Sequence, residues 1–246
     1  MQSTQTRAQN SSNLATTTSK ALTSGYELLT PRQIELNHLL AGPQRHTLFY
    51  GGARSGKTFL IVRAILLRAA RYGGRHAMLR FRANAARASL WLDTLPKVAR
   101  LCFAEGVRLV DHRSDGFVEV QPSGAQIWIA GLDEKERVEK ILGQEFVSIY
   151  LNECSQIPYS SVLLALTRLA EVVPGLTQRA YYDLNPVGSR HWSSLRFVQE
   201  RDPVSLQPTT NPEQYRYARI NPKDNAQNLS AEMLAELAEL PRLEQF

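Results

Sequence analysis

The feature that most constrains the fold of this chain is an octapeptide between a strand-like run and a helix-like run. Residues 51–58 read Gly-Gly-Ala-Arg-Ser-Gly-Lys-Thr and match the phosphate-binding pattern G-x-x-x-x-G-K-[S/T] at every defined position. The preceding residues, 45–50, read as a strand, and apolar residues recur at helical spacing in 59–70. Because this loop functions in a strand–loop–helix unit, the sequence predicts an α/β domain that binds a nucleoside triphosphate.

Each part of this loop has a predicted physical role. The glycines let successive backbone N–H groups turn inward, toward negatively charged phosphate oxygens. The Lys57 ammonium would reach the β- and γ-phosphates, and the Thr58 hydroxyl would bind Mg²⁺. The predicted nucleotide-binding residues of the loop are Gly51, Gly52, Ala53, Arg54, Ser55, Gly56, Lys57 and Thr58.

A helix is predicted to begin shortly before the loop, at Thr30. Thr30 suits an N-cap, Pro31 suits the first turn, and Gln33 completes a capping box. Gln33 also precedes Gly51 by 18 residues. Several P-loop motor families place a glutamine there, whose amide can donate to and accept from the adenine edge. The sequence leaves both roles open for Gln33.

A second nucleotide motif is predicted in residues 146–153, Phe-Val-Ser-Ile-Tyr-Leu-Asn-Glu. This apolar run reads as a buried strand that ends in a polar pair. P-loop ATPases normally carry Asp-Glu there, to hold Mg²⁺ and to orient the attacking water. Glu153 can serve as the base. Asn152 stands at the aspartate position and could hold a Mg²⁺-bound water without contributing charge. The predicted metal-site residues are therefore Thr58, Asn152 and Glu153.

The positive charge of the chain is concentrated in one segment. The formal net charge is +6, but residues 54–108 contain twelve Lys or Arg against two acids. Such a segment suits a polyanion such as nucleic acid. Solvated basic helix faces, balanced by acids elsewhere, produce the same pattern. Charge therefore favours a nucleic-acid partner without establishing one.

Length and composition narrow the class of protein further. A chain of 246 residues fits one α/β domain with appendages. No run reaches 18 apolar residues and no apolar signal core is present, so we expect a soluble, intracellular protein. Cys102 and Cys154 lack metal-ligand neighbours, which argues against a zinc site or a disulfide framework. Residues 1–27 are polar and are predicted to be a disordered tail.

The rest of the pattern predicts a mostly parallel sheet with helices on both faces. A strand is expected at 75–81, followed by a long helix that begins near Ala83 and is interrupted at Pro96. Three short strands should follow and form a small hairpin insert, at 106–111, 116–121 and 125–130.

These motifs together resemble one known family, the large terminase subunits of tailed bacteriophages. The resemblance covers roughly residues 28–246. It is carried by five segments: Gly51–Thr58, Gly131–Gly143, Ile149–Gln156, Tyr181–Trp192 and Asn221–Ser230. It implies a P-loop NTPase with an added-strand, RecA-like sheet and a small C-terminal helical or lid segment. The implied organisation is a motor domain at 28–200 and a lid or linker at 201–246.

The resemblance also implies roles for single residues. Gln33 would contact adenine, and Arg54 would face the phosphates as a charge from the same subunit. Lys57 and Thr58 would bind phosphate and Mg²⁺. Three further positions follow the family pattern. Asn185 would sense the γ-phosphate, Glu153 would be catalytic, and Arg137 would reach the active site of a neighbouring subunit. A solvated place in the surrounding charge run is the alternative for Arg137.

The implied function is that of an ATP-hydrolysing motor that moves double-stranded DNA into procapsids in the host cytoplasm. Its expected partners are a portal protein, a small terminase subunit and further copies in a ring, without a membrane. The alternatives are another P-loop nucleic-acid motor, such as a helicase, or a nucleotide-gated assembly module with weak hydrolysis. The family usually carries a nuclease domain as well. No segment of this sequence matches that domain, so no nuclease activity is expected from these residues.

Overall fold

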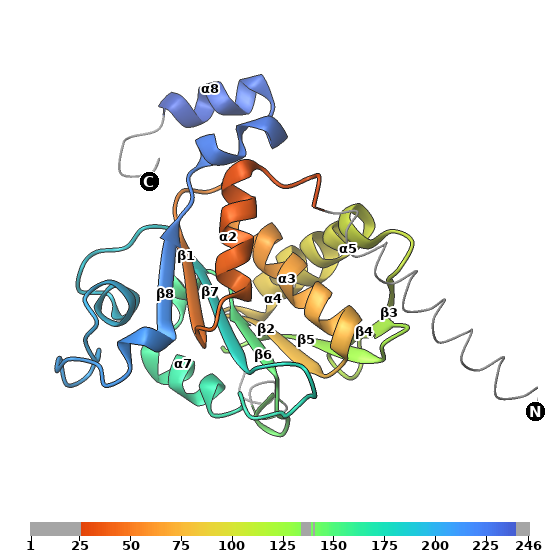
Figure 1. The fold of residues 1–246 in the computed structure, drawn as a ribbon, viewed down its shortest axis with the longest axis horizontal. Helices are drawn as coiled ribbons and strands as arrows, with labels where there is room; N and C mark the ends of the chain where they lie inside the picture. The colour runs from red at the N-terminus through yellow and green to blue at the C-terminus, as the bar shows by residue number, and fades with distance from the viewer. Residues whose placement is uncertain (1–25, 134–138, 140, 240–246) are drawn as a thin grey trace, which may run out of the picture.

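The computed structural model describes residues 26–133, 139 and 141–239. Within these residues, one eight-stranded sheet runs through the molecule in the order β3-β4-β5-β2-β6-β7-β1-β8 (Figure 1). The strands are β1 His46–Tyr50, β2 Arg75–Arg80, β3 Arg108–His112, β4 Phe117–Gln121, β5 Ala125–Gly131, β6 Ser148–Leu151, β7 Arg179–Leu184 and β8 Tyr215–Arg219. The α-helices are α2 Pro31–Ala41, α3 Lys57–Tyr72, α4 Ala83–Ala86, α5 Leu95–Phe103, α7 Tyr159–Leu166 and α8 Ala231–Glu239. The π- and 3₁₀-helices are η1 Arg87–Thr94, η2 Cys154–Gln156, η3 Ser194–Val198, η4 Pro212–Gln214 and η5 Pro222–Asn228.

The sheet confirms the predicted mostly parallel α/β fold. The pairs β5–β2, β2–β6, β6–β7, β7–β1 and β1–β8 are parallel, and only β3–β4 and β4–β5 are antiparallel. The three short strands were expected as a hairpin insert. They instead extend the main sheet, because β5 pairs in parallel with β2 along its length.

The alternation of side chains along the strands creates two hydrophobic cores, one on each face of the sheet. Helices α2, α3, α4 and α5 cover one face and α7 covers the other (Figure 1). The strand residues that face α3 include Phe49, Met78, Tyr150 and Tyr181. Their neighbours that face α7 include Leu48, Leu79, Leu151 and Tyr182.

The predicted interruption at Pro96 does not occur. Helical residues continue from Ala83 to Phe103, and the irregular part is the π-helix η1, which ends just before α5. The amide of Leu95 donates to Leu90 O, a wide i→i−5 turn. Pro96 then falls in the first turn of α5, where its missing N–H costs little.

The C-terminal part contributes to the sheet as well as to the pocket described below. The predicted boundary at residue 200 does not coincide with the edge of the sheet, because β8 pairs in parallel with β1. β8 was not predicted from the sequence; it is an edge strand whose residues are all partly or fully exposed. After it come η5 and the expected C-terminal helix, α8.

Candidate nucleotide-binding site

A pocket of about 760 Å³ opens at the carboxyl ends of β1, β6 and β7. It is lined by the P-loop at 53–59, by Glu153, by residues 183–185, by Gln33 and by parts of 225–233. Ligands of open α/β sheets characteristically bind outside the carboxyl ends of the strands. The structure therefore brings most of the predicted site residues together around one cavity.

The P-loop has the tight backbone that its glycines predict. Gly56 adopts a φ of 86° immediately before α3, and a Cβ at this position would lie 2.3 Å from Gln33 Nε2. Gly51 has a φ of 149°, and a Cβ there would lie 1.9 Å from Ile220 O. Both positions therefore require glycine, for its dihedral freedom and for the close approach of neighbouring atoms.

Lys57 is buried and its ammonium folds back onto the loop. Its Nζ donates to Gly51 O at 2.7 Å, to Gly52 O at 2.8 Å and to Ser55 Oγ at 3.1 Å. Asn185 Oδ1 lies at 3.5 Å, at the end of β7. Burial lowers the pKa of Lys57, while the charges of Asp183 and Glu153 oppose this shift. The ammonium is thus held by the carbonyls and the serine hydroxyl of the loop.

Glu153 follows β6 and is held by neighbouring polar groups. Its backbone is left-handed, with a φ of 47°, which is uncommon for a residue other than glycine. Its carboxylate forms an ion pair with Arg80, at the end of β2, and accepts from Gln156 Nε2 at 3.3 Å. About 37% of its side chain is exposed, so the carboxylate reaches the pocket.

Asp183 is a site residue that the sequence analysis missed. It is 1% exposed near the end of β7, and its Oδ2 accepts from the Thr58 hydroxyl at 2.8 Å. Its Oδ1 accepts from the Glu153 amide at 2.7 Å and from Asn152 Nδ2 at 3.0 Å. Burial and the negative charge of Asp183 raise the pKa of Tyr150. The Tyr150 hydroxyl also accepts a hydrogen bond from Asn152 Nδ2. Asp183 could have been identified from the sequence, because an acidic residue inside an apolar run is seldom buried without a role.

Gln33 takes part in the predicted capping box and also lines the pocket. Its Oε1 accepts from Thr30 N at 3.0 Å, and its backbone amide donates to Thr30 Oγ1. Its Nε2 donates to Asn225 Oδ1 at 3.3 Å, and Asn225 Nδ2 donates to Arg54 O at 2.8 Å. Asn225, which the sequence analysis did not single out, thus links α2, the P-loop and the C-terminal segment.

The two predicted arginines have different outcomes. Arg54 is exposed, lines the pocket and has a φ of 62°. Arg137 lies outside the described residues. Of the two, only Arg54 lies within the described residues, where it lines the P-loop pocket.

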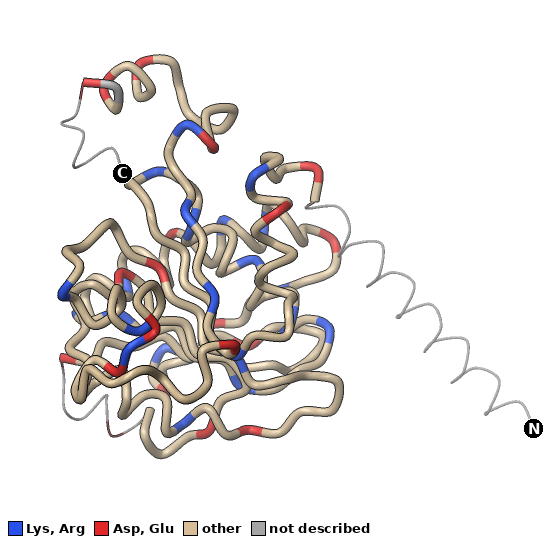
Figure 2. Tube along the Cα trace, turned by 60° about the vertical axis from the view of Figure 1, so that its left-hand side comes forward, with Lys and Arg blue, Asp and Glu red and all other residues tan. Residues whose placement is uncertain are grey.

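The basic segment 54–108 is divided between the interior and the surface. Lys57 and Arg63 are buried, and Arg68, Arg75 and Arg80 are half-buried. The other seven Lys or Arg are exposed, and Figure 2 shows Lys and Arg spread over many elements. Part of the predicted charge is therefore enclosed by protein and is not available to a polyanion.

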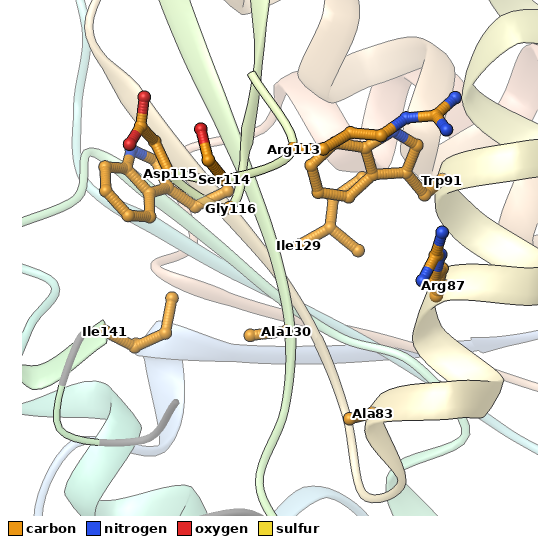
Figure 3. A pocket seen from close by; sticks show the side chains of 11 residues that line it. Ala83, Arg87, Trp91, Arg113, Ser114, Asp115, Gly116, Ile129, Ala130 and Ile141 are labelled. Atoms are coloured by element: carbon orange, nitrogen blue, oxygen red, sulfur yellow. The ribbon is translucent and has the colours of Figure 1, made fainter. Parts of the chain in front are cut away.

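A second cavity, of about 250 Å³, lies between η1, the β3–β4 turn and β5. Figure 3 shows Arg87, Trp91 and Arg113 on one side of it and Ser114 and Asp115 on the other. It shares no lining residue with the P-loop pocket. None of the predicted nucleotide-binding residues lines it.

Fold and site define an α/β domain of the P-loop nucleotide-binding class, with the loop after β1 and a glutamate after β6. The chain belongs to the phage terminase large subunit family, whose model matches residues 43–244. No curated protein matches the sequence. None of the described helices is long and apolar enough to cross a membrane.

Solved structures with a similar fold come from several phages. The large terminase of a thermophilic bacteriophage is 18% identical, with a TM-score of 0.70 over 88% of this chain and 52% of that chain. That terminase has also been solved with ADP and with ATP-γ-S. The Thermus phage P74-26 large terminase ATPase domain is 13% identical, with a TM-score of 0.51 over 85% of this chain and 88% of that chain. The HK97 large terminase is 16% identical, with a TM-score of 0.54 over 86% and 46%. This chain thus spans about half the length of the first of these relatives.

Proposed function

We propose that this chain hydrolyses ATP and couples the hydrolysis to movement of double-stranded DNA into phage procapsids. The observation that carries the proposal is the convergence of Lys57, Thr58 and Glu153 on one pocket, in a member of the phage terminase large subunit family. The ADP and ATP-γ-S complexes of a relative with the same fold support the choice of nucleotide.

In the proposed binding mode, the triphosphate lies along the P-loop. The Lys57 ammonium exchanges its bonds to the carbonyls of Gly51 and Gly52 for bonds to phosphate oxygens, which carry more negative charge. Gln33 can keep its capping box and still contact adenine, because an amide has two N–H groups and an oxygen with two lone pairs. Arg54 adds positive charge at the phosphates.

In the proposed reaction, Glu153 orients a water molecule and accepts its proton as the water oxygen bonds to the γ-phosphorus. The bond from that phosphorus to the β–γ bridging oxygen breaks, and ADP and phosphate leave. Asn185 Oδ1 lies 3.5 Å from Lys57 Nζ, and in this proposal Asn185 responds to the loss of the γ-phosphate. The ion pair between Arg80 and Glu153 must break before the Glu153 carboxylate can accept the proton from water.

Mg²⁺ is part of this proposal, with Thr58, Asn152 and Glu153 as its predicted site. The residues present fit such an ion, because the Thr58 hydroxyl lies 2.8 Å from a buried carboxylate oxygen, and Mg²⁺ prefers oxygen ligands and phosphates. When bound, the ion offsets the negative charge of the β- and γ-phosphates.

Hydrolysis is tested by phosphate release at steady state, with and without DNA and procapsid portals. The motor proposal expects turnover that rises when DNA and portals are present. ADP binding without turnover under any of these conditions would favour the nucleotide-gated assembly module. Strand separation by the chain would favour a helicase. The small terminase subunit, a ring of copies and a place in the host cytoplasm belong to the same proposal.

DNA binding is tested through its dependence on salt. Each neutralised phosphate contributes about −0.9 to the slope of log affinity against log salt. Replacing the exposed Arg82, Arg87 and Arg100 by glutamine should make this slope shallower. A matched triple replacement at exposed arginines outside the basic segment should leave it unchanged. Those control positions are Arg190, Arg201 and Arg216. A wild-type affinity that does not change with salt would reject the DNA interface.

A further inference from the structure

We propose that Asp183 supplies the carboxylate that binds the nucleotide's Mg²⁺, in place of the aspartate that P-loop ATPases usually carry where this chain has Asn152. The charge has then moved from the end of β6 to the neighbouring strand, β7. This inference rests on the proposed ATP hydrolysis and names the residue that would hold its cation.

The register of the sheet places the two side chains together. Leu151 of β6 pairs with Tyr182 of β7, so the next residues, Asn152 and Asp183, lie side by side. Side chains alternate along a strand, and Tyr181 faces the core beneath α3. Asp183 therefore points to the face from which α3 starts, where the P-loop ends. The 2.8 Å bond from the Thr58 hydroxyl to Asp183 Oδ2 confirms this direction.

Asp183 forms no direct ion pair among the described residues, and the buried Lys57 ammonium interacts with its charge at longer range. The groups that hydrogen-bond to Asp183 are all neutral: the Thr58 hydroxyl, the Asn152 amide, the Glu153 backbone amide and the Tyr150 hydroxyl. Asp183 is 1% exposed, so its carboxylate is shielded from water. A buried carboxylate held by neutral donors beside the P-loop threonine provides the oxygen and the charge that Mg²⁺ requires.

The contact with Asp183 also explains the residue at position 152. Asn152 Nδ2 donates to both carboxylate oxygens of Asp183, at 3.0 and 3.2 Å. An aspartate at position 152 would place a second carboxylate at this distance in a buried site, and the two like charges would repel. Only one of the two strands can therefore carry the charge, and the other must carry a donor that orients it.

The test compares the wild type with Asp183→Asn, Asn152→Asp and the exchange Asn152→Asp/Asp183→Asn. Binding of Mn²⁺ in the presence of ADP is followed by electron paramagnetic resonance. ADP affinity is measured by calorimetry, with Mg²⁺ and with EDTA. Asp183→Asn should weaken Mn²⁺ binding about 10- to 100-fold, since metal sites lose at least this much when an orienting partner is removed. Its ADP affinity in EDTA should stay close to the wild-type value.

The exchange variant separates a charge effect from a packing effect. It restores one carboxylate and one amide in opposite positions, so Mn²⁺ binding should recover toward the wild-type affinity. Wild-type Mn²⁺ binding by folded Asp183→Asn protein would overturn the proposal. An exchange variant that binds Mn²⁺ no better than Asp183→Asn would also overturn it.

If Asp183→Asn fails to fold, Asn152→Asp decides the question. Two facing carboxylates should lower its melting temperature in EDTA, and Mn²⁺ with ADP should raise that temperature by more than in the wild type. A rise no larger than that of the wild type would overturn the proposal. None of these measurements requires hydrolysis. A protein that binds Mn²⁺ through Asp183 but does not hydrolyse ATP would refute the proposed function alone.

Discussion

Polar side chains are buried at both the amino ends and the carboxyl ends of the parallel strands, but only those at the carboxyl ends line a pocket. At the amino ends, His46 opens β1, His76 lies near the start of β2 and Arg179 opens β7. At the carboxyl ends, Lys57 and Asp183 are buried to a similar degree. The first group is enclosed by protein, whereas the second lines a pocket.

The amino-end groups contact fixed protein partners, although His76 Nδ1 is buried without a hydrogen-bond partner among the described residues. His46 Nδ1 contacts the Tyr182 hydroxyl at 2.9 Å, and its ring stacks on Tyr215 with centroids 4.5 Å apart. His76 Nε2 contacts Gly73 O at 3.1 Å, and Arg179 donates to backbone carbonyls before β1. Burial lowers the pKa of both histidines to about 3. Burial and a shifted pKa therefore do not mark a functional site in this molecule, whereas a position at the carboxyl end does.

Substitutions at the two ends of the strands should differ most in their effect on the rate of ATP hydrolysis. Glu153→Gln should lower the rate of ATP hydrolysis about 10²- to 10⁴-fold, the usual contribution of a general base, while ADP affinity persists. The matched change at the amino end is Glu171→Gln, since Glu171 accepts from Arg75 N at 2.7 Å. It should lower the melting temperature and leave turnover unchanged. Equal rates for Glu153→Gln and wild type would remove Glu153 from the mechanism.

Nucleotide affinity should show the next largest difference. Lys57→Ala removes the charged donor of the P-loop and should weaken ATP-γ-S binding about 10- to 100-fold, because hydrogen bonds from charged groups contribute about 1.5–3 kcal/mol. Arg179→Met removes a buried cation at the other end and should cost stability without changing affinity. Calorimetric titration and thermal melting measure the two quantities. Wild-type affinity in Lys57→Ala would show that the pocket does not bind phosphate through this loop.

The loss of folding stability in acid should be caused by buried histidines at the amino ends of the strands. His46 and His76 have a pKa of about 3 when folded, below the value of 6.5 for the free side chain. The unfolded chain therefore binds more protons, and stability is lost as pH falls from about 6.5 toward 3. The expected loss is about 1.4 kcal/mol per pH unit for each histidine.

Denaturant melts between pH 7 and 5 check this dependence. A His46→Gln or His76→Gln variant should be less stable at pH 7 but lose less stability on acidification. His38→Gln, at an exposed histidine, should follow the wild-type pH profile. If neither buried-site variant flattens the profile, the two histidines do not cause the acid sensitivity.

The sequence predicted those parts of the site that depend on local pattern. The P-loop, the capping box at Thr30 and the strand that ends at Glu153 each lie within a few consecutive residues. They can therefore be recognised from the sequence alone. Asp183 and Arg80 could not be placed in this way. Their contacts with Asn152 and Glu153 arise from strand order and register, which the one-dimensional pattern does not specify. The edge strand β8 was missed because its alternating Tyr and Arg side chains lack an apolar face.

The smallest expected effect concerns Asn225, which lines the pocket and hydrogen-bonds to neighbouring residues. Its side chain is 8% exposed and bonds to Gln33, Arg54 O and Asn228. Asn225→Ala removes these bonds and should weaken ADP binding about three- to tenfold, because each hydrogen bond contributes about 0.5–1.5 kcal/mol. Asn84→Ala, at an exposed position in α4, is the control.

The effect of Asn225→Ala shows whether Asn225 contributes to nucleotide affinity or only to stability. A loss of ADP affinity would show that the C-terminal segment shapes the pocket through the P-loop backbone, since Asn225 fixes Arg54 O at 2.8 Å. A lower melting temperature with unchanged affinity would instead group Asn225 with the amino-end residues, as a structural contact. Asn225 would then line the pocket without contributing to nucleotide affinity.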